Sequence, residues 1–347
     1  MLAHIAHAHG SPSPTLVLSA ERLPTGEEEL TEALTEGMAW LAERGLEKVT
    51  KIALVALSEH PLFDLDYRFV QVIPGDPVRL DFRGSCGHSV LSSVEVASRL
   101  GWISRLAPEQ RTRVRVLNND EHVVCEVDEC VRERTTFTAH FLNHPSVPLG
   151  DLLPFGETVT DLPYARGVIR SSAVSVGNPY IFLNAADLGA PDTDALFAAD
   201  RELLETMVAI RRSAARQYGW PVEGAFPKVA AVLADGPGAL AVRAVSVPSW
   251  HPTIALTGAV CIGAASQIRG TIPFDLAGGE DQPPGPLQIH TPGGFTTSAP
   301  AVSGIEQHHT LSWVSVPEKT VTFSGALTIE PLASHTVEEE SCLLSTP

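Results

Sequence analysis

Apolar residues follow two different periods along this chain, one typical of helices and one typical of strands. Helical spacing behind an acidic first turn predicts an amphipathic helix between Gly26 and Gly45, because carboxylates stabilise the positive end of a helix. Helical spacing returns over 84–101 and over about 194–217. A further helix is expected over 255–270, and since it has no charged residue until its last turn, we expect it to be buried on all sides.

Runs rich in β-branched and aromatic residues between these helices predict strands, at 51–58, 66–73, 78–82, 111–118, 122–127, 173–184, 227–234, 239–247, 311–316 and 320–329. The second half repeats the order of the first, with strands that lead into a glycine-bearing turn and a helix. We interpret this as an internal duplication in an α+β protein. The proline- and glycine-rich segment at 145–154 is the expected boundary, which gives domains over 1–152 and 153–347.

Composition predicts a folded protein of two domains and disfavours two classes of partner. The chain has 347 residues, of which 44% are hydrophobic and 19% charged, so it can fold around large cores. Its net charge of −17 disfavours nucleic acid and anionic membrane surfaces as partners. The N-terminal sequence MLAHIAHAHGSPSP lacks the basic and apolar regions of a signal peptide, so we expect a cytoplasmic protein. The sequence leaves a homodimer open.

Cysteine and histidine spacings argue against metals and disulfides. The five cysteines form no CxxC pair, and an odd number predicts free thiols in a reducing compartment: Cys86, Cys125, Cys130, Cys261 and Cys342. The 13 histidines show no zinc-enzyme spacing with a carboxylate. No strand–GxGxxG–helix unit or P-loop is present, so we expect a protein that needs neither a metal nor a nucleotide.

Cys86 stands where a glycine-rich turn leads into a helix. Unpaired amides and the positive helix end can lower a thiol pKa there, and the resulting thiolate could take a proton from carbon. A buried structural cysteine is an equally good interpretation at this stage. Lys51 begins an apolar strand and could act as an acid or base if it points inward, although lysines at strand starts usually stay in water.

A resemblance adds to this picture. The run 66–103 contains a strand pair followed by GSCGH, and further runs follow in order: VGNPYIFLNAADLG (176–189), PKVAAVLA (227–234), VRAVSVPSWHPTIALTGAVCIGAASQIRG (242–270) and IHTPGG (289–294). Together these runs resemble the methylaconitate isomerase (PrpF) family, whose motif at the glycine-rich turn is GNCGN. The resemblance implies a fold like that of diaminopimelate epimerase, with two similar domains, strands wrapped around one central helix in each, and the active site in the cleft between them.

The family resemblance also implies a chemistry. Its members move a double bond in unsaturated carboxylic acids without a cofactor, using a cysteine and a lysine, which correspond here to Cys86 and Lys51. His88 replaces the second asparagine of the motif and could relay a proton or pair with the thiolate, or it could face solvent. The residues expected to bind substrate are Ser85, Gly87, Ser89, Asn178, His251, Thr257 and Gly258.

Two departures from the family bear on the substrate. The glycine-rich GGTSKG segment, which helps bind carboxylates, is replaced by the lysine-free HAHGSPSPTLVL, and RGLEKVT replaces the Ser/Thr-rich approach to the lysine. We therefore expect a less charged, conjugated substrate, such as a polyene acid or polyketide intermediate, with a double-bond shift or a lactone or pyrone closure. The alternatives are the family's ordinary isomerisation of aconitate-type tricarboxylates and a non-catalytic relative that binds a small molecule.

Overall fold

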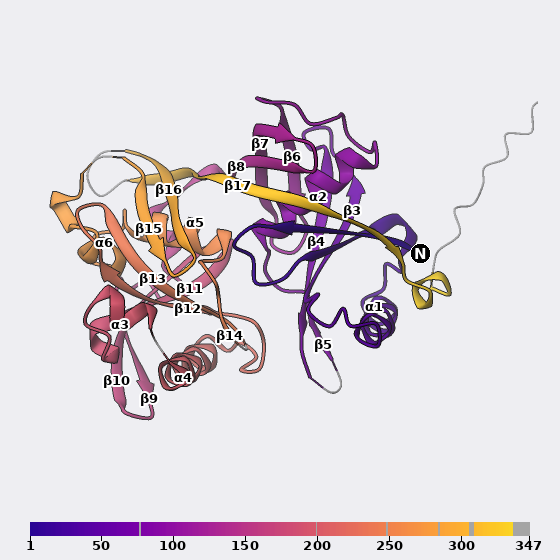
Figure 1. Cartoon of the computed structure of the whole chain (residues 1–347). Coiled ribbons are helices and arrows are strands. Elements are labelled where there is room, and N and C mark those ends of the chain that lie inside the picture. Colours follow the sequence, from indigo (N-terminus) through magenta and orange to yellow (C-terminus); the bar gives the residue numbers. More distant parts are fainter. Residues whose placement is uncertain (76–77, 199, 248, 284, 305–308, 336–347) are drawn as a thin grey trace, which may run out of the picture.

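The computed structural model describes residues 1–75, 78–198, 200–247, 249–283, 285–304 and 309–335. Cys342 lies outside the described residues. The chain forms two lobes that lie side by side, and a long C-terminal strand crosses both (Figure 1). No helix in the described part of the chain is long and apolar enough to span a membrane.

The first lobe is a closed β-barrel around one helix, α2 (Gly87–Arg99). Its strands are β1 (Leu2–Ala8), β2 (Thr15–Ser19), β3 (Lys51–Leu57), β4 (Leu65–Ile73), β6 (Arg111–Val116), β7 (Glu121–Val131) and β8 (Arg134–Pro148), with β5 (Arg79–Asp81) beside β4. Each strand pairs with the next, β17 (Thr310–Thr328) pairs with β8, and β17 also pairs with β1 to close the ring.

The second lobe also wraps strands around one central helix, α5 (Leu256–Ala265), whose residues are all buried as expected. Its strands are β9 (Thr160–Tyr164), β10 (Gly167–Val176), β11 (Asn178–Asn184), β12 (Lys228–Ala234), β13 (Ala239–Ser246), β14 (Ser249–Trp250), β15 (Leu287–Thr291) and β16 (Gly294–Ser303). They pair in the order β9, β10, β11, β12, β13, β15, β16 and β17. The expected α+β fold, with strands wrapped around a central helix in each half, is confirmed.

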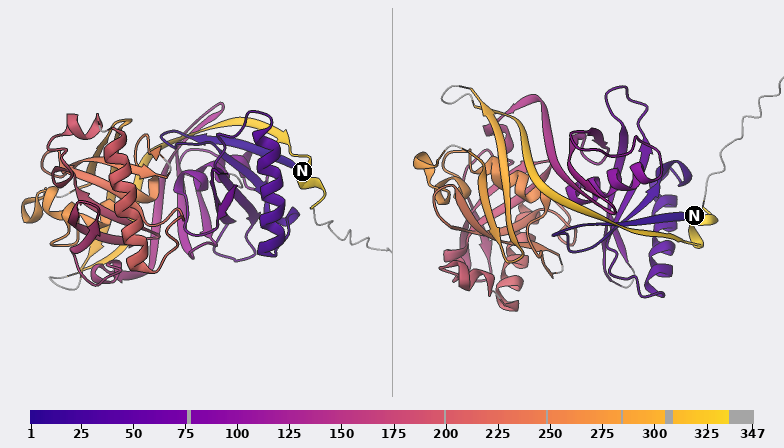
Figure 2. Two further views of the ribbon diagram at one scale, coloured as in Figure 1. Left: turned by 90° about the horizontal axis from the view of Figure 1, so that it is seen from below. Right: turned by 45° about the horizontal axis from the view of Figure 1, so that its top comes forward.

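The remaining helices lie outside these strands. Both α1 (Glu27–Ala42) and α4 (Arg201–Tyr218) lie on the same side of the molecule, one on each lobe (Figure 2). Two short helices, α3 (Thr193–Phe197) and α6 (Ile272–Leu276), complete the second lobe. Residues around α2 and α5 form one continuous hydrophobic core, whereas separate cores lie beneath α1 and α4. The two central helices are therefore packed into a shared interior.

Three expected elements differ from the structure. The run 173–184 is not one strand but the hairpin of β10 and β11, because Gly177 turns the chain with φ +71° and lets Val176 pair with Asn178. The helix expected over 194–217 is divided into α3 and α4, each with its own aspartate N-cap. The two late strands are one strand, β17, with an irregularity at its centre.

The division into domains at residue 152 stays a prediction. The C-terminal strand β17 contributes to both halves, because it begins beside β16 of the second lobe and ends beside β1 of the first.

Candidate active site

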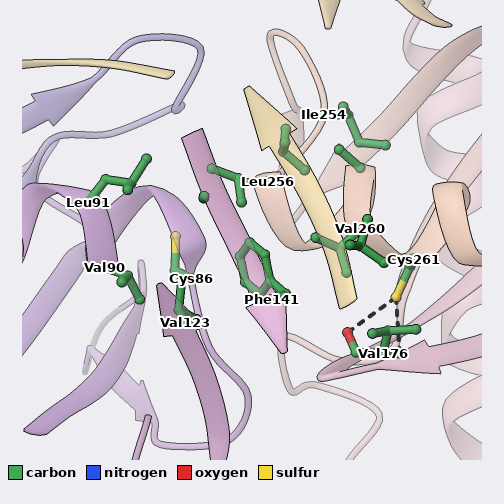
Figure 3. Packing of buried hydrophobic residues seen from close by; sticks show 14 of the residues in the cluster. Cys86, Val90, Leu91, Val123, Phe141, Val176, Ile254, Leu256, Val260 and Cys261 are labelled. Atoms are coloured by element: carbon green, nitrogen blue, oxygen red, sulfur yellow. Dashed lines mark hydrogen bonds between the residues drawn. The ribbon is translucent and has the colours of Figure 1, made fainter. Parts of the chain in front are cut away.

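The two central helices begin close to each other at the junction between the lobes. Cys86 is the N-cap of α2, and Ala255 is the N-cap of α5. A Cβ atom at Gly87 would lie 2.7 Å from Leu256 Cδ2 and 2.8 Å from Phe141 Cζ, so only glycine permits this approach. Figure 3 shows Phe141 of β8 between Cys86 and the first turns of α5. The glycine-rich turn thus brings the thiol to the interface between the lobes.

Lys51 points inward and acts on the Cys86 thiol. Its side chain is 5% exposed, and its Nζ donates a hydrogen bond of 2.7 Å to Ser11 Oγ. Burial raises the pKa of Cys86, but the Lys51 charge and hydrogen bonds from Ser89 and Lys51 outweigh burial and leave that pKa below its ordinary value. The structure therefore excludes the interpretation that Lys51 stays in water. It also supplies a physical reason for an activated thiol.

A cavity of about 30 Å³ lies beside this thiol. This volume matches one water molecule, so a substrate can reach the thiol only if the surrounding side chains or the lobes move apart. Of the expected site residues, it is lined by Lys51, Ser85, Cys86, Asn178, His251 and Thr257. Gly87, Ser89 and Gly258 lie in the helix turns behind it, and Ser89 Oγ shares a 2.9 Å hydrogen bond with Thr15 Oγ1.

Lys228 also lines this cavity and was not among the expected residues. It begins β12 just as Lys51 begins β3, so the duplicated fold places a lysine from each lobe at the same cavity. Burial lowers the pKa of Lys228 to about 8, although the Cys86 charge raises it. Its ammonium lies 4.9 Å from the Phe226 ring centre. The sequence signal was available, because both strands open with lysine before an apolar run.

Asn178 of the second lobe forms hydrogen bonds with the glycine-rich turn that precedes α2. Its Oδ1 accepts from the Ser85 backbone N–H at 2.8 Å, and its Nδ2 donates to the Ser85 carbonyl at 2.7 Å and to Thr257 Oγ1 at 3.1 Å. These bonds use the acceptor and both donor hydrogens of the amide. Asn178 therefore holds the turn that carries Cys86 in place, beside whatever contact it makes with substrate.

Glu121 is a second residue that the sequence did not single out. Ser85 Oγ donates a 2.7 Å hydrogen bond to Glu121 Oε2. Burial raises the pKa of Glu121 to about 7, although hydrogen bonds from Ser85 and Asn119 lower it. A Cβ atom at Gly177 would lie 2.0 Å from Glu121 Oε1, so this carboxyl group is pressed against the second lobe. Nothing in its sequence context marks it as buried.

His88 and His251 form a neutral pair between the lobes. His88 is 2% exposed, which excludes the interpretation that it faces solvent, and its ring lies 6.2 Å from that of His251 at an angle of 19°. Burial and the nearby Lys51 charge hold the pKa of both rings well below the usual range. Among the described residues, His88 Nδ1 and His251 Nε2 have no hydrogen-bond partner. Both rings therefore have unused hydrogen-bonding capacity.

The described residues contain no group of three or more His, Cys, Asp or Glu side chains that could hold a metal ion. Four cysteines are described, and all four are free thiols. Of these, burial raises the pKa of Cys125 and Cys261, the latter despite a bond from the Val176 amide. Cys86 is thus the one buried cysteine in the described chain whose pKa is lowered.

Comparison with known proteins assigns the chain to a family. The model of the PrpF protein family matches residues 35–316. The chain belongs to the PrpF family. The chain is similar to the 3-methylitaconate isomerase of Eubacterium barkeri, with 26% identity over 64% of this chain and 69% of that protein. It is also similar to the 2-methyl-aconitate isomerase of Cupriavidus necator, with 26% identity over 67% of this chain and 70% of that protein.

A solved structure of methylitaconate-delta-isomerase has the same fold as this PrpF chain. It superposes with a TM-score of 0.65 at 20% identity and covers 98% of both chains. At this identity the likeness concerns the fold alone. The family expected from the sequence runs is confirmed, and the named relatives are isomerases.

Proposed function

We propose that this protein is an isomerase that moves a proton, and with it a carbon–carbon double bond, in an unsaturated carboxylic acid. The observation that carries this proposal is the contact of Lys51 and Ser89 with the Cys86 thiol, which lowers the thiol pKa at the start of α2 beside a cavity. A thiolate next to an ammonium group provides a base and an acid at one place. The named relatives, which are isomerases of methylitaconate and 2-methyl-aconitate, support the reaction class.

The proposed reaction needs no oxidant or reductant. The Cys86 thiolate takes a proton from the carbon next to the double bond, and the electrons of that C–H bond form the new double bond. The electrons of the old double bond are displaced toward the substrate carboxylate. The Lys51 ammonium then gives a proton to the far carbon of the three-carbon unit. A final proton transfer from the Cys86 thiol to the Lys51 amine restores the resting state.

Lys228 is proposed to hold the substrate carboxylate. In the described chain it pairs with no carboxylate, and it faces the thiol cavity from the opposite lobe. An ammonium group there would stabilise negative charge that develops during proton removal, in a site from which water is mostly excluded. The start of α5, with Thr257 at the cavity wall, would add backbone N–H groups for the same charge.

The finer choice of substrate is part of this proposal. The lysine-free segment at 7–18 favours a longer conjugated acid of the polyketide type, for which the same deprotonation would start a double-bond shift or the closure of a lactone or pyrone. Lys228 favours a substrate that keeps at least one carboxylate. Aconitate-type tricarboxylates remain the alternative, and the choice depends on how many carboxylates the site can pair.

Mass spectrometry of substrates in deuterated water tests the proposal. The panel contains methylitaconate, methylaconitate, oxalomesaconate and unsaturated monocarboxylates of increasing length. We expect deuterium at an allylic carbon of at least one acid with the wild-type protein and none with Cys86→Ser. Binding of an acid without exchange would favour the non-catalytic alternative. Exchange that persists in Cys86→Ser would contradict the role of the thiol.

A further inference from the structure

A second cavity lies on the other side of the histidine pair. It has a volume of about 180 Å³ and is lined by the β1–β2 turn, the β15–β16 turn, the middle of β17 and the first turn of α5. His88 forms part of its wall, whereas His251 lines the thiol cavity. The two stacked rings therefore stand between the two cavities. None of the residues expected from the sequence, apart from His88, lines this second space.

The backbone of β17 is distorted where it passes this cavity. The pairing of β17 with β8 shifts register between Val316 and Lys319, and Glu318 has a φ of 57°. Such a bulge changes the direction in which the next side chain points, and a non-glycine residue in this conformation is strained. The residue that follows is Lys319, which lines the cavity and donates a hydrogen bond to Thr296 Oγ1. The strained residue Glu318 is therefore followed directly by a lysine that lines the cavity.

The lysines of this chain are concentrated around these two cavities. The sequence has only four lysines, and three of them, Lys51, Lys228 and Lys319, line one cavity or the other, whereas Lys48 is exposed. Among the described residues, none of these three has a carboxylate within ion-pairing distance. The chain contains 41 acidic residues, so carboxylates are not scarce. An ammonium that is buried without a counter-ion is costly, and a ligand that supplies the anion removes this cost.

Burial affects Lys319 as it does Lys228. It lowers the pKa of Lys319 to about 8, although the charge of Glu318 raises it. Glu318 is exposed and lies at the rim of the cavity, where water screens its charge. Threonine side chains, His9 and the neutral His88 complete the polar part of the lining, and burial lowers the pKa of His9 as well. Phe295 is 72% exposed, lines the same cavity and stacks on His290 with ring centres 4.1 Å apart.

We propose that this cavity is a second carboxylate-binding site, distinct from the thiol cavity. A small organic acid places its carboxylate against Lys319 and Thr296, and its carbon chain extends along the exposed face of Phe295. The acid comes from one of two sources, either a distant carboxylate of the substrate or a separate small acid. Recognition requires only a carboxylate with a short apolar part. Apart from Lys319, the charged group of the lining is the carboxylate of Glu318 at the rim, so no second cation is available for a second carboxylate.

Calorimetric titration with butyrate tests this site. The proteins compared are the wild type, Lys319→Met, Lys228→Met and the control Lys48→Met, whose side chain is exposed. We expect two binding events in the wild type and in Lys48→Met. Lys319→Met should lose one event and Lys228→Met the other, each by about 10–100-fold in affinity, the worth of one charge-assisted hydrogen bond. Lys319→Gln is a second variant, in case the methionine variant does not fold.

Unchanged binding in both Lys319 variants, with loss only in Lys228→Met, would overturn the proposal. Kinetics separate the two sources of the acid. If the carboxylate belongs to the substrate, Lys319→Met raises KM for di- and tricarboxylates and leaves KM for monocarboxylates unchanged. If the acid is separate, KM is unchanged for both classes and butyrate loses its second binding event. The calorimetry requires no turnover, so a failure of the proposed isomerisation leaves its result intact.

Discussion

The two lobes share one plan and differ in the groups that they bring to the junction. Each lobe begins a strand with a buried or half-buried lysine, Lys51 or Lys228, and points the start of a central helix at the other lobe. The first lobe has Cys86 at its helix start, whereas the second has Ala255. The two lobes thus form a nearly symmetric frame in which only the first places a thiol at the start of its central helix. In the proposed reaction, proton transfer therefore depends on the first lobe, and the second lobe contributes charge and shape.

Removal of the Cys86 thiol should have the largest effect on activity and tests the difference between the lobes most directly. Cys86→Ser should lower turnover by about 10²–10⁴-fold, because serine in the same place is a far weaker base and acid. Circular dichroism and thermal unfolding should stay close to wild type, since the two side chains are nearly the same size. Cys130→Ser, which changes an exposed thiol, is the matched control and should keep full activity. Activity of Cys86→Ser above about a tenth of wild type would contradict the assignment.

Loss of Lys51 should lower activity by a similar factor and should also change its pH dependence. Lys51→Met removes the charge that lowers the pKa of Cys86, so kcat/KM should fall by about 10²–10⁴-fold and its low-pH limb should move to higher pH. Reaction of Cys86 with iodoacetamide, followed against pH by peptide mass spectrometry, measures the same shift without turnover. Lys48→Met should change neither quantity. If the pH profile of alkylation is unshifted in Lys51→Met, Lys51 does not lower the pKa of Cys86.

The second-lobe lysine should affect binding more than turnover. Lys228→Met should raise KM by about 10–100-fold, since one charge-assisted hydrogen bond contributes about 1.5–3 kcal/mol. The pKa of Lys228 is lowered to about 8, so the wild-type KM should rise above that pH as the ammonium loses its proton. In Lys228→Met this rise should be absent. Equal losses in kcat for the Lys51 and Lys228 variants would instead indicate that both lobes take part in proton transfer.

A last expected effect concerns the pH dependence of stability at the junction. The pKa of Glu121 is raised from 4.5 to about 7 in the folded protein, so between these pH values the unfolded chain binds fewer protons than the folded one. Folding stability from this group is therefore present below about pH 4.5 and falls by about 3 kcal/mol as the pH rises toward 7. Glu121→Gln should unfold at a higher temperature than wild type at pH 8 and at a similar temperature at pH 4.5.

The exposed variant Glu129→Gln is the control for this measurement. It should reproduce the pH dependence of the wild type. If Glu121→Gln does so as well, Glu121 is ionised in the folded protein and the proposed linkage is wrong.

The sequence predicted the frame of this molecule better than its site. Helical and strand periods located α1, α2, α5 and most strands, because one face of each element is buried and its apolar residues repeat accordingly. The hairpin at Gly177 was missed because both of its strands are apolar and join through a single glycine. β1 and β8 were also not predicted, since histidine and threonine residues interrupt their apolar alternation. The strands β2, β9, β14, β15 and β16 were not predicted either.

The site was only partly predictable, for a different reason. Cys86 stands beside glycines at a helix start, and this local pattern is visible in sequence. Glu121 and Ser11 reach the junction through tertiary contacts with residues far away in the chain, and local context does not report such contacts. Lys228 was missed although its strand opens with lysine before an apolar run, as the strand of Lys51 does. Lys319 depends on a distortion in the middle of a strand, which the sequence marks only by the preceding Pro317.

The path of β17 has a consequence for how the protein is made. The ring of the first lobe closes only when Leu2 pairs with Thr328, so the N-terminal barrel waits for the last strand to leave the ribosome. Until then the edges of β1 and β8 are open and can pair with other chains. At a synthesis rate of about 5–20 residues per second, this exposure lasts for many seconds. A polypeptide that ends near residue 152 would keep this opening permanently, and should aggregate rather than form a free-standing first lobe.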